Sequence, residues 1–299
     1  MNTIPDKQNE PGQLDLLLAQ RRLYSQAKVC FTWKISLSMV FAIGGPILSS
    51  IYEPASGYVG LAAIVCLFVN LLALERLESS YKVNAAKIQE LFDAYLFDLP
   101  WNEYVAGKKP DGELVAKTLA SNLKRDIGGL RNWYAVDVGR VDLGFAILLC
   151  QRSNAWWDTT LRKKFIALLI TALVVVAVVV VICALVSQLT VQKFIIGIIV
   201  PTLPLIEVAI VQLRDNKEAA STTNELKENV DDEIEKWMEN HTPPNSGAIA
   251  RTFQDQIWRH RSKCPMIFDW VNKLWKPKHE QQMQFAVHLK VEEFLRRRT

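Results

Sequence analysis

Residues 165–186 form an apolar run, FIALLITALVVVAVVVVICALV, whose 22 residues include one polar side chain, Thr171, and no charge. A helix of this length rises about 1.5 Å per residue and crosses a hydrocarbon core of roughly 30 Å. A fully buried helix of a large soluble protein is the alternative. Three similar stretches, at 35–52, 57–74 and 194–213, argue against that alternative. The sequence therefore predicts four transmembrane helices.

Two short connectors group the four stretches into pairs. EPASG joins the first two, and SQLTVQK joins the last two. Connectors of this length force the helices they join to run antiparallel, so two transmembrane hairpins are expected. Lysine and arginine near the ends of such helices favour the cytoplasmic side, where we therefore expect both termini and the central region. The hairpin tips carry Lys193 alone, whereas the opposite side carries Arg21, Arg22, Lys28, Lys34, Arg76, Lys82, Arg162, Lys163, Lys164, Arg214 and Lys217.

The expected fold is an all-α membrane protein, with two transmembrane helical hairpins and helical cytoplasmic regions. We expect a cytoplasmic N-terminal interfacial helix (1–33), a first transmembrane hairpin (34–75), a central cytoplasmic helical region (76–163), a second transmembrane hairpin (164–213) and a C-terminal cytoplasmic helical region (214–299). The interfacial helix would place one apolar face at the membrane surface, formed by Leu14, Leu17, Leu18 and Tyr24.

Apolar residues at three- and four-residue spacing predict the helices of the cytoplasmic regions. These helices are expected at 77–96, 113–125, from about 137, from about 215, at 248–261 and at 280–298. The helix from about 215 carries an apolar stripe of Leu226, Val230, Ile234, Trp237 and Met238. The stretch VDLGFAILLCQ at 141–151 is too short to cross a membrane, so it is expected to be buried in the protein.

The sequence lacks the short motifs that mark common enzymes. It contains no Gly-x-x-x-x-Gly-Lys phosphate loop, no Gly-x-Gly-x-x-Gly, no His-Glu-x-x-His and no Gly-x-Ser-x-Gly. Four histidines and Cys264 share the C-terminal region, but their spacing matches no structural zinc pattern. The net charge of +4 is small and biased toward the membrane flanks, which argues against DNA or RNA as a partner. We therefore expect no enzyme, no cofactor and no metal site.

The fourth apolar stretch carries an ionisable group. Glu207 follows the sequence PTLP at 201–204, whose prolines free backbone carbonyls that a water-lined path would satisfy. A carboxylate at membrane depth is costly unless it faces protein or water. Glu207 could instead lie near the cytoplasmic end and reach toward Arg214 as an anchor, and both interpretations stay open. The candidate pore-lining or gating residues are Glu207, Asn70, Pro201, Thr202 and Pro204.

A second candidate site combines arginine, asparagine and tryptophan on the cytoplasmic side. A guanidinium group can donate two parallel hydrogen bonds to the oxygens of one phosphate. Cations and bases stack on aromatic rings. The candidate ligand-binding residues are Arg131, Trp133, Arg152, Asn154 and Arg162. The neighbouring Trp156 and Trp157 suit interfacial anchors better. If these arginines bind no ligand, the sensor is expected in the C-terminal helices around Arg251, Gln254 and Arg261.

Several short motifs occur in a characteristic order along nearly the whole chain. They are AQRRLY at 19–24, QELFD at 89–93, LPWN at 99–102, WY at 133–134, CQRxNxxWDxxLR at 150–162, and FQDQI at 253–257 with Arg261. With the order hairpin, helices, hairpin, helices, these motifs resemble the SMODS-associated four-transmembrane family of pore-forming effectors. The resemblance implies a bacterial inner-membrane effector of a CBASS-type antiphage system, which a cyclic-nucleotide second messenger opens to permeabilise the membrane.

The expected partners follow from the apolar stretches, the number of helices and the resemblance. They are the lipid bilayer, a cyclic oligonucleotide ligand and further copies of the chain, because four helices alone enclose too little space for a conduit. A bestrophin-like anion channel is one alternative, although the acidic calcium-clasp run of that family is missing here. A non-conducting membrane scaffold for a cytoplasmic partner is the other. A scaffold would not need Glu207 or the prolines at 201 and 204.

Overall fold

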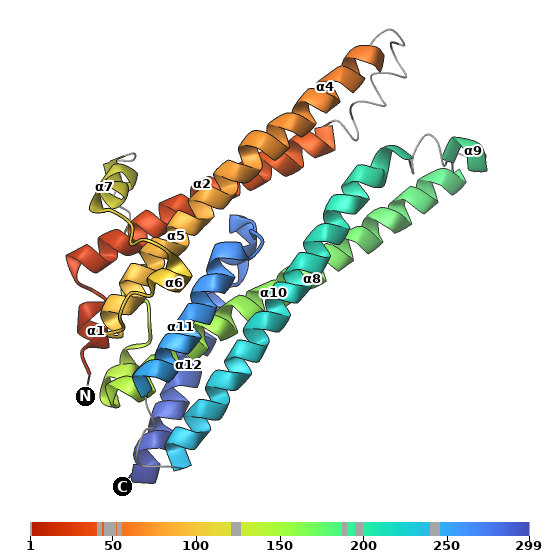
Figure 1. The fold of residues 1–299 in the computed structure, drawn as a ribbon. Coiled ribbons are helices and arrows are strands. Elements are labelled where there is room, and N and C mark those ends of the chain that lie inside the picture. Colours follow the sequence, from red (N-terminus) through yellow and green to blue (C-terminus); the bar gives the residue numbers. More distant parts are fainter. Residues whose placement is uncertain are drawn as a thin grey trace.

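The computed structural model describes residues 2–40, 44, 52, 56–120, 127–186, 190–194, 200–239 and 246–298. Every regular element in these ranges is a helix, which confirms the all-α prediction for this part of the chain (Figure 1). The elements are α1 (Ile4–Lys7), α2 (Pro11–Met39), α4 (Ser56–Val69), the π-helix η3 (Asn70–Leu74), α5 (Glu75–Leu96), α6 (Glu103–Ala106), α7 (Gly112–Ala120), the 3₁₀ helix η4 (Val136–Arg140), α8 (Leu143–Val186), α9 (Val191–Phe194), α10 (Val200–Glu239), α11 (Ser246–Lys263) and α12 (Asp269–Arg298).

Two long pairs of helices form the frame of the molecule. α2 packs along α5, and α8 packs along α10. In Figure 1 both pairs extend in the same direction from a body that holds both chain ends. Within the first pair Lys34 Nζ lies 3.1 Å from Glu78 Oε2, and within the second Thr159 Oγ1 lies 2.8 Å from Thr223 Oγ1. The connections at the far ends, at 41–55 and 187–199, lie largely outside the described residues.

One helix in the described ranges is long and apolar enough to cross a membrane, within α8 at Leu143–Ile182. Within its most apolar stretch, only 6% of the residues are buried inside the protein. The exposed side chains there are aliphatic: Val174, Val175, Val176, Val178, Val179, Val181 and Ile182. A continuous apolar surface of this kind needs lipid or protein to cover it. This finding supports the third predicted span, and the other three spans stay predictions.

The body contains a hydrophobic core to which both helical pairs contribute. Phe92 of α5 and Phe145 of α8 are fully buried in it, and the Phe145 ring stacks on Phe294 of α12 with centroids 4.0 Å apart. Of the short apolar stretch 141–151, which was predicted to be buried, Val141 and residues 145–151 are buried and residues 142–144 are half-buried. The predicted stripe of α10 is also confirmed, because all its members are buried: Leu226, Val230, Ile234, Trp237 and Met238.

The N-terminal helix differs from its expected position. Leu14, Leu17 and Leu18, which the sequence assigns to the membrane surface, are buried in the protein core. α2 also runs without a break from Pro11 to Met39, past the expected boundary at residue 33. The reason is tertiary: α5 presents an apolar face of its own, and pressing the two faces together removes both from water.

Several helix boundaries also differ from the predicted ones. α8 starts at Leu143, after the 3₁₀ turn of η4, and α10 runs unbroken through the expected start near residue 215. α12 begins at Asp269 instead of near 280, although Pro277 lies inside it. A proline removes one helical hydrogen bond. Val271, in the unexpected first part of α12, is fully buried in a cluster with Leu161 and Phe165, and this packing keeps the segment helical.

Candidate functional site

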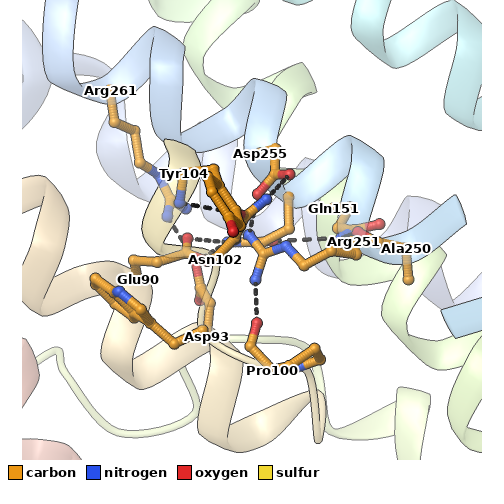
Figure 2. Close-up of polar contacts among 12 residues, drawn as sticks. Glu90, Asp93, Pro100, Asn102, Tyr104, Gln151, Ala250, Arg251, Asp255 and Arg261 are labelled. Carbon is orange, nitrogen blue, oxygen red and sulfur yellow. Dashed lines mark hydrogen bonds and ion pairs between the residues drawn. The ribbon is translucent and has the colours of Figure 1, made fainter. Parts of the chain in front are cut away.

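α11 lies between the two helical pairs and contacts α5 on one side and α8 on the other. Its sequence, SGAIARTFQDQIWRHRSK, is amphipathic. Ala250, Phe253 and Ile257 recur at three- and four-residue spacing and are buried in the core. The polar side chains at neighbouring positions are thereby directed at α5 and α8, where they make the contacts drawn in Figure 2. α11 therefore joins the two pairs through polar groups in a largely buried position.

Asp93 of α5 is a fully buried carboxylate with several hydrogen-bond donors around it. Arg261 Nη1 lies 2.6 Å from its Oδ2, and Gln254 Nε2 donates to the same oxygen at 3.0 Å. Tyr134 donates its hydroxyl to Oδ1 at 2.7 Å and accepts from Asn154 Nδ2 at 2.8 Å. Burial and the nearby Asp93 charge raise the pKa of Tyr134 well above its ordinary value, so the phenol stays a donor.

Glu90 lies one helical turn before Asp93 and is 1% exposed. Its Oε1 lies 2.6 Å from Arg251 Nη2, and its Oε2 accepts from Gln254 Nε2 at 2.9 Å. Burial raises the pKa of Glu90 to about 6, although the charge of Arg251 opposes this rise. We call Glu90, Asp93, Arg251, Gln254 and Arg261 the α5–α11 network.

A second network joins α11 to α8. Asp158 lies 2.6 Å from Arg162 Nε and 2.7 Å from His260 Nε2. Arg162 is 2% exposed, and its Nη1 also donates to Asn216 Oδ1 of α10 at 2.7 Å and to the Pro265 carbonyl at 3.3 Å. Burial lowers the pKa of His260, but the Asp158 carboxylate outweighs this effect and the pKa rises to about 9. We call Asp158, Arg162 and His260 the α8–α11 network.

We expect the α8–α11 network to lose stability as the pH rises from about 6.5 to about 9. The folded-state pKa of His260 is above its unfolded value, so its contribution is fully present below the unfolded pKa and is lost as the pH passes the folded one. The contribution is at most roughly 3 kcal/mol. Melting temperatures of the detergent-solubilised protein across this range would measure it. His260→Gln should show a flatter profile there, and parallel profiles for the two proteins would contradict the assignment.

The structure does not bring the five ligand candidates of the sequence together. Arg162 belongs to the α8–α11 network, and Arg152 Nε lies 2.5 Å from Asp231 Oδ1 of α10. Asn154 donates to the hydroxyl of Tyr134, which in turn donates to Asp93. Trp133 is half-buried and packs against the core, whereas Arg131 is exposed. Arg152 and Arg162 thus each bind a carboxylate of the protein itself.

Sequence reasoning named Arg251, Gln254 and Arg261 as the second choice for a sensor and gave no role to Glu90 or Asp93. A usable signal was present in QELFD. This motif places two carboxylates three residues apart, on a helix whose Ile88 and Phe92 are buried. Carboxylates on an apolar helix face need partners, because burying an unpaired charge is costly. The identity of those partners, more than 150 residues away, could not be deduced from spacing.

The height of Glu207 along the second pair follows from two contacts between α8 and α10. Arg162 meets Asn216, and Thr159 meets Thr223. Glu207 lies nine residues before Asn216 and sixteen residues before Thr223 in α10. The same counts along α8, from Arg162 and from Thr159, reach residues 171 and 175. Glu207 is therefore level with residues 171–175 of α8. These residues lie near the middle of the apolar run 165–186. The Glu207 side chain is exposed, and Arg214 pairs with Asp215 at 3.0 Å.

The other intramembrane candidates are only partly described. Asn70 is the first residue of η3, and its Oδ1 is buried without a hydrogen-bond partner. π-helical turns of this kind often occur at functional sites. Pro201, Thr202 and Pro204 lie in the first turns of α10, and their side chains are outside the described part of the chain.

A helical body joined to long helices with exposed apolar faces is the architecture of a membrane protein with a large part outside the bilayer. Residues 2–289 match the family model of the SMODS-associating 4TM effector domain, and the chain belongs to this family. A "probable CBASS effector molecule" of Bacillus cereus (strain VD146) is 28% identical over 288 residues, which cover 93% of this chain and 95% of the relative. No solved structure matches the chain. The family predicted from the motifs is thereby confirmed, and membership supports a CBASS effector role for this membrane protein.

Proposed function

We propose that the protein is an oligomeric inner-membrane pore-forming effector of a CBASS-type antiphage system. A cyclic-nucleotide second messenger binds its cytoplasmic body and opens the pore, which permeabilises the membrane. The observation that carries this proposal is the position of Glu207: an exposed carboxylate level with the middle of the apolar run of α8. The family membership supplies the setting of the proposal.

An exposed charge at this height cannot remain in contact with lipid. Placing a carboxylate at the centre of a bilayer costs several kcal/mol unless water or protein surrounds it. Within one chain Glu207 is exposed, so a second copy or a water-filled path must cover it. A closed ring of copies supplies both, with Glu207 facing the water inside and the valines of α8 facing lipid or the next copy.

The long helices offer a mechanical connection between the body and the membrane. α8 extends over 44 residues and α10 over 40, and each continues from the buried core of the body into the apolar region. The two networks of α11 hold this pair against α5 of the other pair. A ligand that binds better to a rearranged body shifts the equilibrium toward that state, and the continuous helices carry the movement into the membrane.

Glu207→Gln should change leakage by about fivefold or more, the equivalent of ~1 kcal/mol of charge interaction in the pore. The measurement is dye release from liposomes that contain the full-length protein, after addition of cyclic di- and trinucleotides. Ligand affinity should be unaltered, because Glu207 is remote from the body. Glu235→Gln is the matched control, since Glu235 is an exposed glutamate of α10 outside the apolar region.

Mass measurement in mild detergent should show several copies of the chain. If the active protein is strictly monomeric, the proposal that it forms a pore is wrong. Equal leakage by the Glu207→Gln variant and the wild type would return Glu207 to the role of an anchor. A wild-type protein that protects cells without any leakage would favour the scaffold.

A further inference from the structure

A surface depression of about 670 Å³ lies beside the α5–α11 network, between the connection from α5 to α6 and the N-terminal half of α11. Its lining residues are Pro100, Trp101, Asn102, Glu103, Tyr104 and Arg251. Figure 2 labels Pro100, Asn102, Tyr104 and Arg251 around the buried carboxylates of α5. The depression thus opens to solvent on one side and meets Arg251, which joins α11 to α5, on the other.

The outer part of the depression carries aromatic rings. Tyr104 is fully exposed, at 103% of the reference area, on a helix of four residues. The Trp101 indole is held in place because its Nε1 donates to the Gly107 carbonyl at 2.8 Å. Asn102 caps α6 by accepting from the Tyr104 amide at 3.2 Å, which fixes the short helix that presents the tyrosine. Aromatic rings beside solvent are platforms on which nucleobases stack.

The inner part of the depression carries a guanidinium group with unused hydrogen-bonding capacity. Arg251 Nη2 lies 2.6 Å from Glu90 Oε1 and 2.8 Å from Asp255 Oδ1, and Nη1 donates to the Pro100 carbonyl at 3.1 Å. Arg251 Nε is buried and has no hydrogen-bond partner. A buried donor without an acceptor is unfavourable. Phosphate oxygens bind two adjacent guanidinium donors together, so they would satisfy this nitrogen.

We propose that this depression is the ligand site of the effector: a nucleobase of a cyclic oligonucleotide stacks on Tyr104 and Trp101, and a phosphate takes Arg251 away from Glu90. The proposal rests on the proposed function. It assigns the ligand to the corner of α5, α6 and α11 instead of Arg131, Arg152 and Arg162. The chemical class is a phosphodiester with an accessible base, because the site offers both rings and a cation.

Competition for Arg251 links this site to the rest of the molecule. Glu90 and Gln254 hold α5 to α11, and Arg251 supplies the charge that balances Glu90. When the phosphate draws Arg251 outward, Glu90 loses that partner beside the buried Asp93, and the contact between α5 and α11 weakens. α11 remains bound to α8 through His260 and Asp158. The two helical pairs can then move relative to each other.

Three variants of the full-length protein in lipid nanodiscs test the site. The probes are cyclic di- and trinucleotides that together carry each of the four common bases. Tyr104→Ala should weaken binding about 5- to 150-fold through lost stacking. Arg251→Gln should weaken it about 10- to 100-fold. Glu90→Gln should act in the opposite direction and tighten binding, because a neutral amide no longer competes for Arg251.

Matched controls separate this site from general damage. Phe285→Ala removes another exposed aromatic ring, and Arg297→Gln removes another paired arginine, both on α12. Both should bind as the wild type does. Tyr104 is fully exposed, so its variant tests the proposal even if Arg251→Gln does not fold.

If Tyr104→Ala and Glu90→Gln both bind nucleotide as tightly as the wild-type protein does, this site is wrong. The pore is tested separately, by nucleotide-induced leakage through the wild-type protein, and would stand. Weaker binding by Glu90→Gln would overturn the competition for Arg251. If none of the probes binds the wild-type protein, both this site and nucleotide activation are wrong, whatever the leakage shows.

Discussion

Arg261→Met should lower the free energy of unfolding by about 3–5 kcal/mol, because it leaves Asp93 as a buried charge without its ion-pair partner. Asp93 is fully buried, and Arg261 Nη1 lies 2.6 Å from its Oδ2. Methionine fills a similar volume, so the loss reports the charge more than a cavity. Intrinsic fluorescence of the nine tryptophans during heating in detergent would follow the unfolding. We expect the melting temperature to fall by roughly 10 °C.

Two further variants identify the cause of this loss. Arg297→Met removes an arginine whose pair with Glu293 lies on the exposed surface of α12, and should change stability by less than about 0.5 kcal/mol. The double variant Asp93→Asn with Arg261→Met removes both charges. It should recover a large part of the stability lost in Arg261→Met, because a neutral amide is much less costly to bury than an unpaired carboxylate. A double variant no more stable than the single one would exclude the buried charge as the cause.

Arg162→Gln should destabilise the protein by about 1.5–3 kcal/mol and should leave ligand affinity unaltered. Arg162 is almost fully buried, and its guanidinium binds groups from three segments: Asp158 of α8, Asn216 of α10 and the Pro265 carbonyl between α11 and α12. Its removal leaves Asp158 with His260 alone. The pKa of Asp158 is held well below its ordinary value. Burial raises this pKa, but Arg162 and His260 together lower it by more than burial raises it. The aspartate therefore stays charged in the variant, paired with His260 alone.

Lys163→Gln is the matched control, because Lys163 is the exposed neighbour of Arg162 on the same helix. It should melt close to the wild type. Nucleotide binding by Arg162→Gln is measured well below its melting temperature. A variant that melts like the wild type and has lost nucleotide binding would restore Arg162 to the phosphate-binding role that the sequence suggested.

Much of the architecture could be predicted from short windows of the chain. The capacity of the apolar run at 165–186 to span a membrane could be predicted from that run alone, because length and composition decide whether a helix can cross a membrane. The burial of 145–151 was predictable for a related reason: that apolar stretch is too short to cross a bilayer and too apolar for water. The stripe from Leu226 to Met238 repeats with the period of a helix, so its buried face could be identified without knowing what covers it.

The boundaries that were wrong depended on distant parts of the chain. The start of α12 at Asp269 needs Val271 to pack in a cluster with Leu161 and Phe165, over 100 residues earlier. The burial of Leu17 and Leu18 needs an apolar face on α5. Neither contact leaves a signal in the local sequence.

The sequence by itself determined that the chain is helical, that one stretch has the length and polarity to span a bilayer, and to which family the chain belongs. These properties depend on neighbouring residues or on the order of motifs. Only the tertiary structure decided which carboxylate each arginine meets: Asp93 with Arg261, Glu90 with Arg251, and Asp158 with Arg162 and His260. The physical reason is that an arginine has the same charge wherever it stands. Its role in binding a phosphate or an internal carboxylate depends on which groups the folded helices place within about 3 Å of it.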